Sequence, residues 1–388
     1  MTSVASIVKA RAQSRANAEN DSANVRIRVF IQAIVAILLV IGLGATISAS
    51  SVVAANEGLN FAHYGIRQAA FSFLGVLIMA VAARVPHDTY RKFAVPLYGG
   101  VVGLLVLTLL NGAVRGGSRR WIELGPIDLQ ASELAKFAVI VALATVLAKK
   151  EREDQLDDPR HFFVPVLLYL GIVAGLVMLQ PDLGTTLVIG TGALGVILAS
   201  RVKLRYVAGL GVLGASAALL LAVVAPYRFN RVAAWLDPAV DTSGISYHLN
   251  QSMAALGSGG MLGVGIGESR LRWSYLPNAH TDFIFSIIGE ELGFAGTMFI
   301  VMAFGALAAL GVAVTMRAQD RFGAMVAAGI TAWISLQAFV NIGGVTGLLP
   351  ITGMTLPFVS YGGSSLLVVM GAVGVLLSIA SKGRSVRA

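Results

Sequence analysis

Long apolar runs, each about as long as a bilayer is thick, recur along almost the whole chain. A helix of roughly 20 apolar residues spans a bilayer because it satisfies all its backbone hydrogen bonds internally. The predicted spans are 28–50, 66–83, 94–110, 134–148, 162–179, 183–200, 204–225, 283–315, 322–345 and 363–380. Charged residues make up only 13% of the sequence, against roughly 25% in soluble domains. The sequence therefore predicts an all-α polytopic membrane protein of about ten transmembrane helices.

The domain organisation is expected to be simple, because no polar stretch is long enough to fold around its own core. We predict a disordered cytoplasmic tail over 1–25, a single transmembrane domain over 26–382 and a short cytoplasmic tail over 383–388. The chain has no cysteine, which excludes disulfides, thiol catalysis and Cys-ligated metal sites.

The distribution of basic residues predicts the orientation. Of the 29 Lys and Arg residues, 20 lie on the side that carries both termini, so both termini are expected in the cytoplasm. This bias explains most of the net charge of +9, and no nucleic-acid partner is expected. The outward basic residues are concentrated in or beside two segments, 111–136 and 226–282. They indicate either contacts with lipid headgroups or a site for an anionic substrate such as a phosphate.

The segment 226–282 is predicted to be a large extracytoplasmic loop between the seventh and eighth spans. Its glycine-rich stretch, 257–267, lacks the strand and the Gly-Lys-Ser/Thr ending of a nucleotide-binding loop, so we interpret it as a flexible, closely packed loop. The following run, 283–315, is too long for one straight span and carries Glu290 and Glu291. It is expected to tilt, break or project from the bilayer.

Charged residues near the ends of two spans are candidates for chemistry. Asp282 precedes an apolar run and is interpreted either as a helix N-cap or as a carboxylate base at the membrane boundary. His280 either tunes that carboxylate or is solvated. Glu133 and Lys136 lie at an i, i+3 spacing, which predicts an ion pair that is structural, part of a polar cavity wall, or both.

Glycine and proline interrupt the chain between the last two spans. Gly343, Gly344, Gly347, Pro350 and Pro357 predict a broken or re-entrant segment before the tenth span. Such segments also mark transporter sites, so a transporter remains an alternative.

Several motifs together resemble one known family. They are Gly117–Ile122 (GSRRWI), Ser132–Lys136 (SELAK), Gln180–Thr185 (QPDLGT), His280–Phe285 (HTDFIF), Glu290–Gly293 (EELG) and Pro357–Ser364 (PFVSYGGS). Their order and spacing are similar to those of the SEDS family, named for shape, elongation, division and sporulation. One departure is Ala131, where many members carry proline, and it affects only the expected start of the helix.

The resemblance implies an activity and partners. SEDS proteins are inverting peptidoglycan glycosyltransferases of the bacterial cell membrane, which polymerise lipid II and release undecaprenyl diphosphate. They work with a class B penicillin-binding protein and other divisome membrane proteins. The motifs are more similar to the division members than to the elongation (RodA-type) members. A lipid II flippase and a divisome scaffold are the alternatives.

The resemblance also implies site residues. The essential aspartate of the family maps onto Asp282, expected as the catalytic base or as a ligand of a divalent cation such as Mg²⁺ or Mn²⁺. Arg120 and Lys136 are expected to contact the diphosphate, and the need for cations beside the leaving group adds Arg231 or Arg272 as further contacts. Glu133, His280 and Ser360 complete the expected substrate-binding set.

Overall fold

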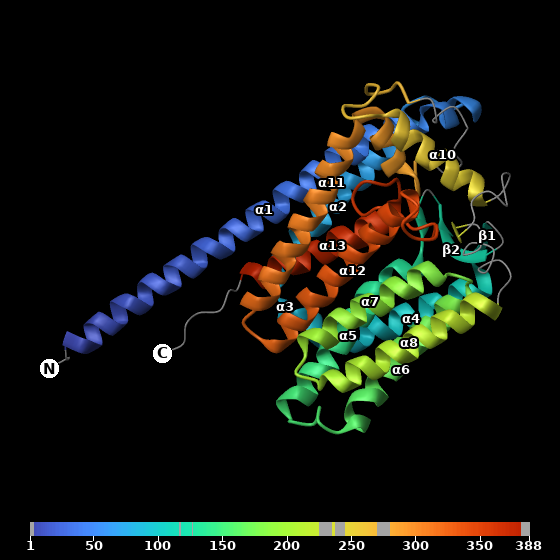
Figure 1. The fold of residues 1–388 in the computed structure, drawn as a ribbon. Helices are drawn as coiled ribbons and strands as arrows, with labels where there is room; N and C mark the ends of the chain where they lie inside the picture. Colours follow the sequence, from blue (N-terminus) through green and yellow to red (C-terminus); the bar gives the residue numbers. More distant parts are fainter. Residues whose placement is uncertain are drawn as a thin grey trace.

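The structure, a computed structural model, describes residues 4–115, 118–125, 127–224, 235–236, 245–269 and 280–381. The helices are α1 Val4–Asn56, α2 His63–Arg84, α3 His87–Lys92, α4 Ala94–Asn111, α5 Ala131–Arg152, α6 Pro159–Leu179, α7 Leu183–Ala199, α8 Leu204–Val224, α10 Ile245–Ser258, α11 Ile284–Arg317, α12 Arg321–Val345 and α13 Gly363–Ser381. The strands are β1 Ala113–Arg115, β2 Ser118–Leu124 and β3 Ile127–Leu129. Each predicted span falls on a helix (Figure 1).

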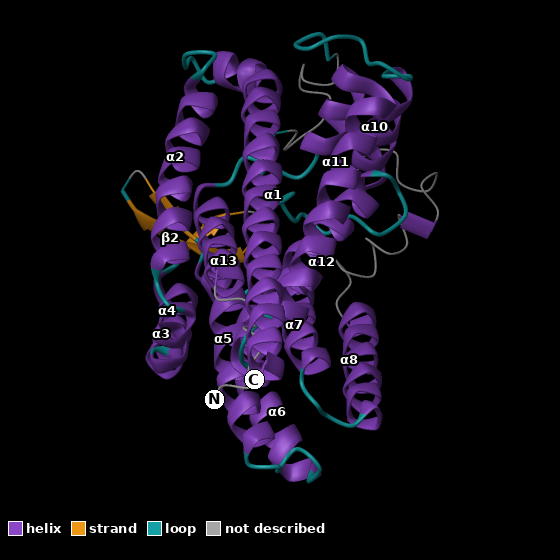
Figure 2. Cartoon of the chain, turned by 90° about the vertical axis from the view of Figure 1, so that its left-hand side faces the viewer, coloured by secondary structure: helices purple, strands orange, loops and turns teal. Residues whose placement is uncertain are grey.

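The membrane-spanning character of the chain is confirmed. Within the described residues, eight helices are long and apolar enough to cross a bilayer, and α7 and the stretch Leu204–Ala217 of α8 are shorter apolar helices. Most of these helices run side by side as a bundle (Figure 2). The chain is therefore an all-α, multi-pass membrane protein, as predicted.

Three helices form the interior of the bundle. In α5, α12 and α13, 78%, 67% and 72% of the most apolar 18-residue stretch is buried, against 11% in α2. Small residues allow this close packing. A Cβ on Gly195 of α7, for example, would lie 2.6 Å from the carbonyl oxygen of Ala328 in α12. The outer helices expose apolar side chains, as expected for surfaces that face lipid.

The long helix α11 is broken, as its length predicted. Gly293 has φ 67° and ψ −165°, which interrupts the helical hydrogen bonds. The glycine-rich stretch after α10 supplies replacements. Val264 N and Gly265 N donate to the carbonyls of Glu290 and Glu291, and Phe294 N and Ala295 N donate to Gly260 and Met261, at 2.9–3.1 Å. The predicted close packing of this stretch is therefore confirmed, and it satisfies the backbone of the break.

A three-stranded antiparallel sheet in the order β1-β2-β3 joins α4 to α5, and the sequence analysis did not predict it. In its β2–β3 pair, Ile122 faces Leu129, and Gly125 takes φ 69° at the turn. The strands are three to seven residues long, too short to give a clear alternating pattern. The end of the bundle that carries these strands is called the sheet end below, and the end that carries α3 is called the α3 end.

Two further predictions concern non-helical segments, one before α13 and one at the N-terminus. Residues 346–362, between α12 and α13, are non-helical, and Leu356, Phe358 and Val359 are buried, which agrees with the predicted broken segment. By contrast, α1 begins at Val4, so most of the stretch expected as a disordered tail is helical. That stretch contains many alanines and neither glycine nor proline, so nothing in it ends the helix.

Candidate functional site

A pocket of about 370 Å³ opens at the sheet end of the bundle. Its walls come from β2, the start of α5, the start of α7, residues 281–282 and 353–355, and the start of α13. The volume lies within the range of roughly 300–1,000 Å³ that is typical of small-molecule sites. Four residues selected from the sequence line it together: Arg120, Glu133, Lys136 and Asp282.

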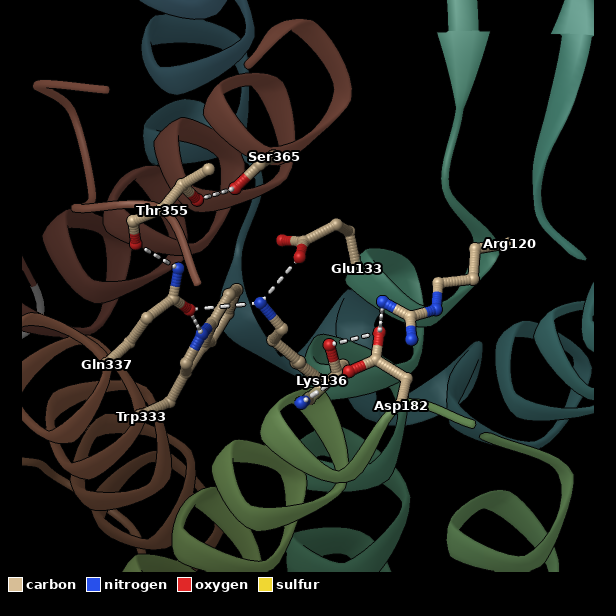
Figure 3. Close-up of polar contacts among 9 residues, drawn as sticks. Arg120, Glu133, Lys136, Asp182, Trp333, Gln337, Thr355 and Ser365 are labelled. Atoms are coloured by element: carbon tan, nitrogen blue, oxygen red, sulfur yellow. Dashed lines mark hydrogen bonds and ion pairs between the residues drawn. The ribbon is translucent and has the colours of Figure 1, made fainter. Parts of the chain in front are cut away.

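Glu133 and Lys136 form the ion pair that their spacing predicted. Lys136 Nζ lies 2.7 Å from Glu133 Oε1, and the two side chains are 2% and 7% exposed. Lys136 Nζ also donates to Gln337 Oε1 at 3.0 Å and lies 5.5 Å from the ring centroid of Trp333. Figure 3 shows the ammonium between the carboxylate and the amide. The pair is thus both structural and part of the pocket wall, because it ties α5 to α12 there.

Gln337 extends this network, and the sequence analysis missed it. Its Oε1 accepts hydrogen bonds from Lys136 and from Trp333 Nε1, the latter at 2.8 Å. Its Nε2 donates to the carbonyl of Thr355 at 3.0 Å, which ties the segment after α12 to the pocket. The available signal was a polar amide inside an otherwise apolar span.

Arg120 projects from β2 toward the start of α7. Its guanidinium donates to the carbonyls of Gln180 and Pro181 at 3.1 and 2.7 Å, and it lies 3.8 Å from Asp182 Oδ2. Asp182 caps α7, as its position predicted, because its Oδ1 accepts from Thr185 N at 3.0 Å. Arg120 remains 31% exposed and lines the pocket, while its contacts fix its position.

Asp282 also lines the pocket, directly before α11. The N-cap of α11 is Phe283, so the interpretation of Asp282 as the N-cap is wrong. Asn341 Nδ2 donates to the carbonyl of Asp282 at 2.9 Å and to that of Met354 at 2.6 Å. Gly353 has φ 75°, and a Cβ there would lie 3.5 Å from Asp282 Oδ2. Asn341 thus fixes the backbone at Asp282, and Gly353 lies beside its carboxylate.

His280 packs beside the pocket and does not line it. Its ring lies between Tyr64 and Tyr361, with centroid distances of 5.3 and 5.6 Å. Burial lowers the pKa of His280 below 6.5, and the charge of Glu57 opposes this shift in part. A neutral ring between two tyrosines indicates a packing role, and the expected solvated state is wrong.

Ser360 does not contact the pocket either. Its Oγ accepts a hydrogen bond from Leu356 N at 2.8 Å, and its carbonyl accepts from Gln68 Nε2 at 3.3 Å. Both contacts stabilise the irregular segment, so the structure gives Ser360 a structural position and not the expected substrate contact. Arg231 and Arg272 lie outside the described residues, and their assignment stays a prediction.

Other lining residues were also missed from the sequence. They are Arg67, Asp128, Gln130, Thr185, Tyr361 and Ser364 among others. Arg67 was visible as an outward basic residue at the start of a span, and Ser364 belongs to a quoted motif. Asp128 lies on β3, whose strand character gave no signal.

A divalent cation needs several ligand atoms close to one another. Within the described residues, one group of three His, Asp or Glu side chains brings its ligand atoms within 4.8 Å of one another: His87, Asp88 and Asp320. It lies at the α3 end, away from Asp282. Within the described residues, a cation bound to Asp282 would therefore draw its other ligands from carbonyl, hydroxyl, water or substrate oxygens.

Comparison with known proteins gives the decisive observation. Residues 28–385 match the family model described as "Cell cycle protein", which covers FtsW, RodA and SpoVE. The chain belongs to this family. The resemblance predicted from the six motifs is confirmed.

Relatives and solved structures agree with this family. The chain is 41% identical to a probable peptidoglycan glycosyltransferase FtsW of Coxiella burnetii, over 88% of this chain and 93% of that protein. It is 40% identical to the stage V sporulation protein E of Bacillus subtilis, over 90% and 95%. A crystal structure of the rod shape determining protein RodA of Thermus thermophilus aligns with a TM-score of 0.67 and 27% identity, over 90% and 95%. A chain from a peptidoglycan synthase complex that coordinates polymerization and crosslinking aligns with a TM-score of 0.71 and 29% identity, over 91% and 96%.

Proposed function

We propose that this chain is a peptidoglycan glycosyltransferase that polymerises lipid II into β-1,4-linked glycan strands and releases undecaprenyl diphosphate. Relatives named as probable peptidoglycan glycosyltransferases, at 38% and 41% identity over most of the chain, support the reaction class. One observation carries the proposal: a single pocket gathers Asp282, the Glu133–Lys136 pair and Arg120 from segments far apart in the sequence. This set includes the carboxylate and the cation that glycosyl transfer from a diphosphate requires.

The reaction inverts the sugar, because the donor is α-linked to diphosphate and the product is β-linked. Asp282 accepts the proton from the 4-hydroxyl of the acceptor as that oxygen attacks the anomeric carbon of the donor. The bond from the anomeric carbon to the diphosphate breaks, and the diphosphate leaves with the electron pair. The exposed edge of Arg120, together with Arg231 and Arg272, stabilises the charge on the leaving group.

Replacing the proposed base is the direct test. We expect Asp282→Asn to lower the initial rate of lipid II polymerisation by at least about 100-fold, because amides do not accept the proton. The assay uses the full chain with its partner in liposomes and labelled lipid II. The matched control is Asp157→Asn, which removes an exposed carboxylate that pairs with Lys203 at 3.0 Å, at the α3 end. An Asp282→Asn variant that polymerises at the native rate would contradict the assignment of Asp282 as the base.

The proposed location is the bacterial cell membrane, with both termini in the cytoplasm and the pocket on the outer face. The 20-to-9 split of basic residues supports this orientation. The chain has no cysteine, so single cysteines introduced near either end can be labelled from one side without background. Labelling of a cysteine beside the pocket from the cytoplasmic side only would contradict the orientation.

The proposed partner is a class B penicillin-binding protein, and the proposed setting is cell division with other divisome membrane proteins. The similarity to a chain of a peptidoglycan synthase complex supports a transpeptidase partner. Co-purification with the cognate protein, and polymerisation that depends on it, tests this point.

A lipid II flippase is the second candidate, and the break in α11 at Gly293 favours it, because transporters use broken helices. Lipid II translocated into sealed liposomes by the Asp282→Asn variant, without polymer, would support the flippase.

A further inference from the structure

The described walls of the pocket do not form a simple anion site. Four carboxylates, Asp128, Glu133, Asp182 and Asp282, line it together with three cations, Arg67, Arg120 and Lys136. Two of the three cations are already next to carboxylates: Lys136 lies 2.7 Å from Glu133, and Arg120 lies 3.8 Å from Asp182. In the described part of the pocket, positive charge therefore does not exceed negative charge. A diphosphate needs an excess of positive charge, so most of these walls suit another part of a substrate.

The Glu133–Lys136 pair has hydrogen-bonding capacity left over. An ammonium carries three N–H groups, and Lys136 donates to Glu133 Oε1 and Gln337 Oε1 within the described chain. Glu133 Oε2 is buried and has no hydrogen-bond partner among the described residues. Figure 3 shows this oxygen pointing away from Lys136, toward the segment that carries Thr355 and Ser365. The pair therefore offers one donor and one acceptor side by side, with no net charge.

A second polar atom in the same pocket lacks a partner. Ser364 lines the pocket from the start of α13, is 4% exposed, and its Oγ has no hydrogen-bond partner among the described residues. Burying a polar atom without a partner is destabilising. Two such atoms around one pocket indicate that a ligand supplies their hydrogen bonds when it is bound.

We infer that Glu133, Lys136 and Ser364 bind the hydroxyl groups of a sugar ring and that the pair does not cradle the diphosphate. A hydroxyl donates one hydrogen bond and accepts others, so it can donate to Glu133 Oε2 while it accepts from Lys136 Nζ. A phosphate oxygen only accepts, and Glu133 Oε2 would repel it. The inference rests on the proposed function for the identity of the sugar, and it corrects the expectation that Lys136 contacts the diphosphate.

The test measures binding, so it does not depend on catalysis. Dissociation constants are measured for the full chain in nanodiscs with lipid II, with analogues in which one sugar hydroxyl at a time is replaced by hydrogen, and with undecaprenyl diphosphate. For one deoxy analogue we expect binding to the native chain to weaken by about tenfold. The same analogue should lose less affinity on Glu133→Gln than on the native chain, because an amide oxygen accepts a hydrogen bond from a hydroxyl more weakly than a carboxylate does. Undecaprenyl diphosphate should bind both proteins equally, within about twofold.

Ser364→Ala provides an independent variant that removes no charge. We expect it to weaken the binding of lipid II by about threefold to tenfold and to leave the affinity for undecaprenyl diphosphate unchanged. The matched control is Ser132→Ala, which removes another buried hydroxyl without a described partner, on α5 but outside the pocket lining. The control should leave the affinity for both ligands unchanged.

Two results would overturn the inference. One is that every deoxy analogue loses affinity by the same factor for the native chain and for the variants. The other is a tenfold loss of undecaprenyl diphosphate binding in Glu133→Gln or Ser364→Ala. Failure of the proposed function would appear differently, as tight and hydroxyl-selective binding of lipid II without polymer from the native chain.

Discussion

At the scale of single residues, the site depends on side chains that hold backbone in place. Asn341 contacts the carbonyls of Asp282 and Met354, and Gln337 contacts Lys136 and the carbonyl of Thr355. Both amides lie on α12 four residues apart, so one helix face positions both walls of the pocket. The sequence identified the charged residues of the site, because charges within apolar runs are conspicuous. It did not identify these amides as positioning residues, because the carbonyls and the Lys136 ammonium that they contact belong to distant segments of the chain.

Asn341→Ala tests the positioning role. The variant leaves two buried carbonyls without their donor, which we expect to cost about 1–3 kcal/mol for each. The position of Asp282 then relaxes, and the polymerisation rate per folded molecule should fall by about tenfold or more. The matched control is Ser378→Ala, which removes a buried hydrogen bond of 2.6 Å to the carbonyl of Val85 at the α3 end. The control should lower the melting temperature without changing that rate, and an equal loss of rate in both variants would contradict the positioning role.

His280 predicts a pH dependence of stability. Burial lowers its folded-state pKa below the ordinary 6.5. Between the two pKa values the unfolded chain binds the proton and the folded chain does not, so stability falls as the pH drops below about 6.5. Above about pH 7 the neutral His280 ring makes its full contribution to stability. Melting temperatures of the native chain and of His280→Phe, which keeps a ring between Tyr64 and Tyr361, should therefore diverge only on the acid side. Parallel curves throughout would show that folding does not shift the pKa of His280.

At the scale of elements, the broken helix α11 and the glycine-rich stretch form one unit. Each segment supplies the hydrogen bonds that the other lacks, and glycines allow the two backbones to touch. The length of the run predicted that α11 would break, and Gly293 marks the place. The partner of the break could not be read from the sequence, because backbone hydrogen bonds carry no residue-specific pattern. The sheet was missed for a related reason, since its strands are short and partly polar.

Gly263→Ala tests this unit. Gly263 has φ 83°, and a Cβ there would overlap the carbonyl of Glu291. Backbone strain of this kind costs about 1–3 kcal/mol before the clash is counted, so the variant should melt clearly lower. The matched control is Gly257→Ala in α10, where nothing lies within 4 Å of the added Cβ. We expect the stability of this control variant to be unchanged or to rise by up to about 1 kcal/mol, because alanine favours a helix over glycine. Equal melting temperatures for the two variants would contradict the close packing.

At the scale of the whole molecule, the two ends of the bundle differ in their chemistry. The sheet end holds the pocket, whereas the α3 end holds a cluster of ion pairs. There Glu151 of α5 accepts hydrogen bonds from Arg321 at 2.5 and 3.2 Å and lies 3.6 Å from Arg201. The spans could be predicted from apolar length, and the expected orientation follows from charge; both are local properties of the sequence. The convergence of β2, α5, α12 and α13 on one pocket could not, because it depends on contacts between distant segments.

Glu151→Gln should separate these two ends. The Glu151 side chain is 8% exposed and Arg321 is 42% exposed. The variant should therefore lose about 1–2 kcal/mol of stability, a value between those of a buried and a surface ion pair. The polymerisation rate per folded molecule should not change. The matched control is Glu153→Gln on the same helix end, which removes an exposed 4.0 Å pair with Lys149 and should cost less than about 0.5 kcal/mol. A loss of rate in Glu151→Gln would mean that the two ends are coupled.

The pairing of Glu133 with Lys136 also matters during synthesis. Gln337, the other hydrogen-bond partner of Lys136, follows it by 201 residues and leaves the ribosome much later. When α5 first enters the bilayer, Glu133 and Lys136 therefore have only each other as hydrogen-bonded partners. Their separation by one helical turn lets them neutralise each other within a single segment, before any neighbouring helix arrives. The same short-range pair thus eases the insertion of the helix that later forms the centre of the bundle.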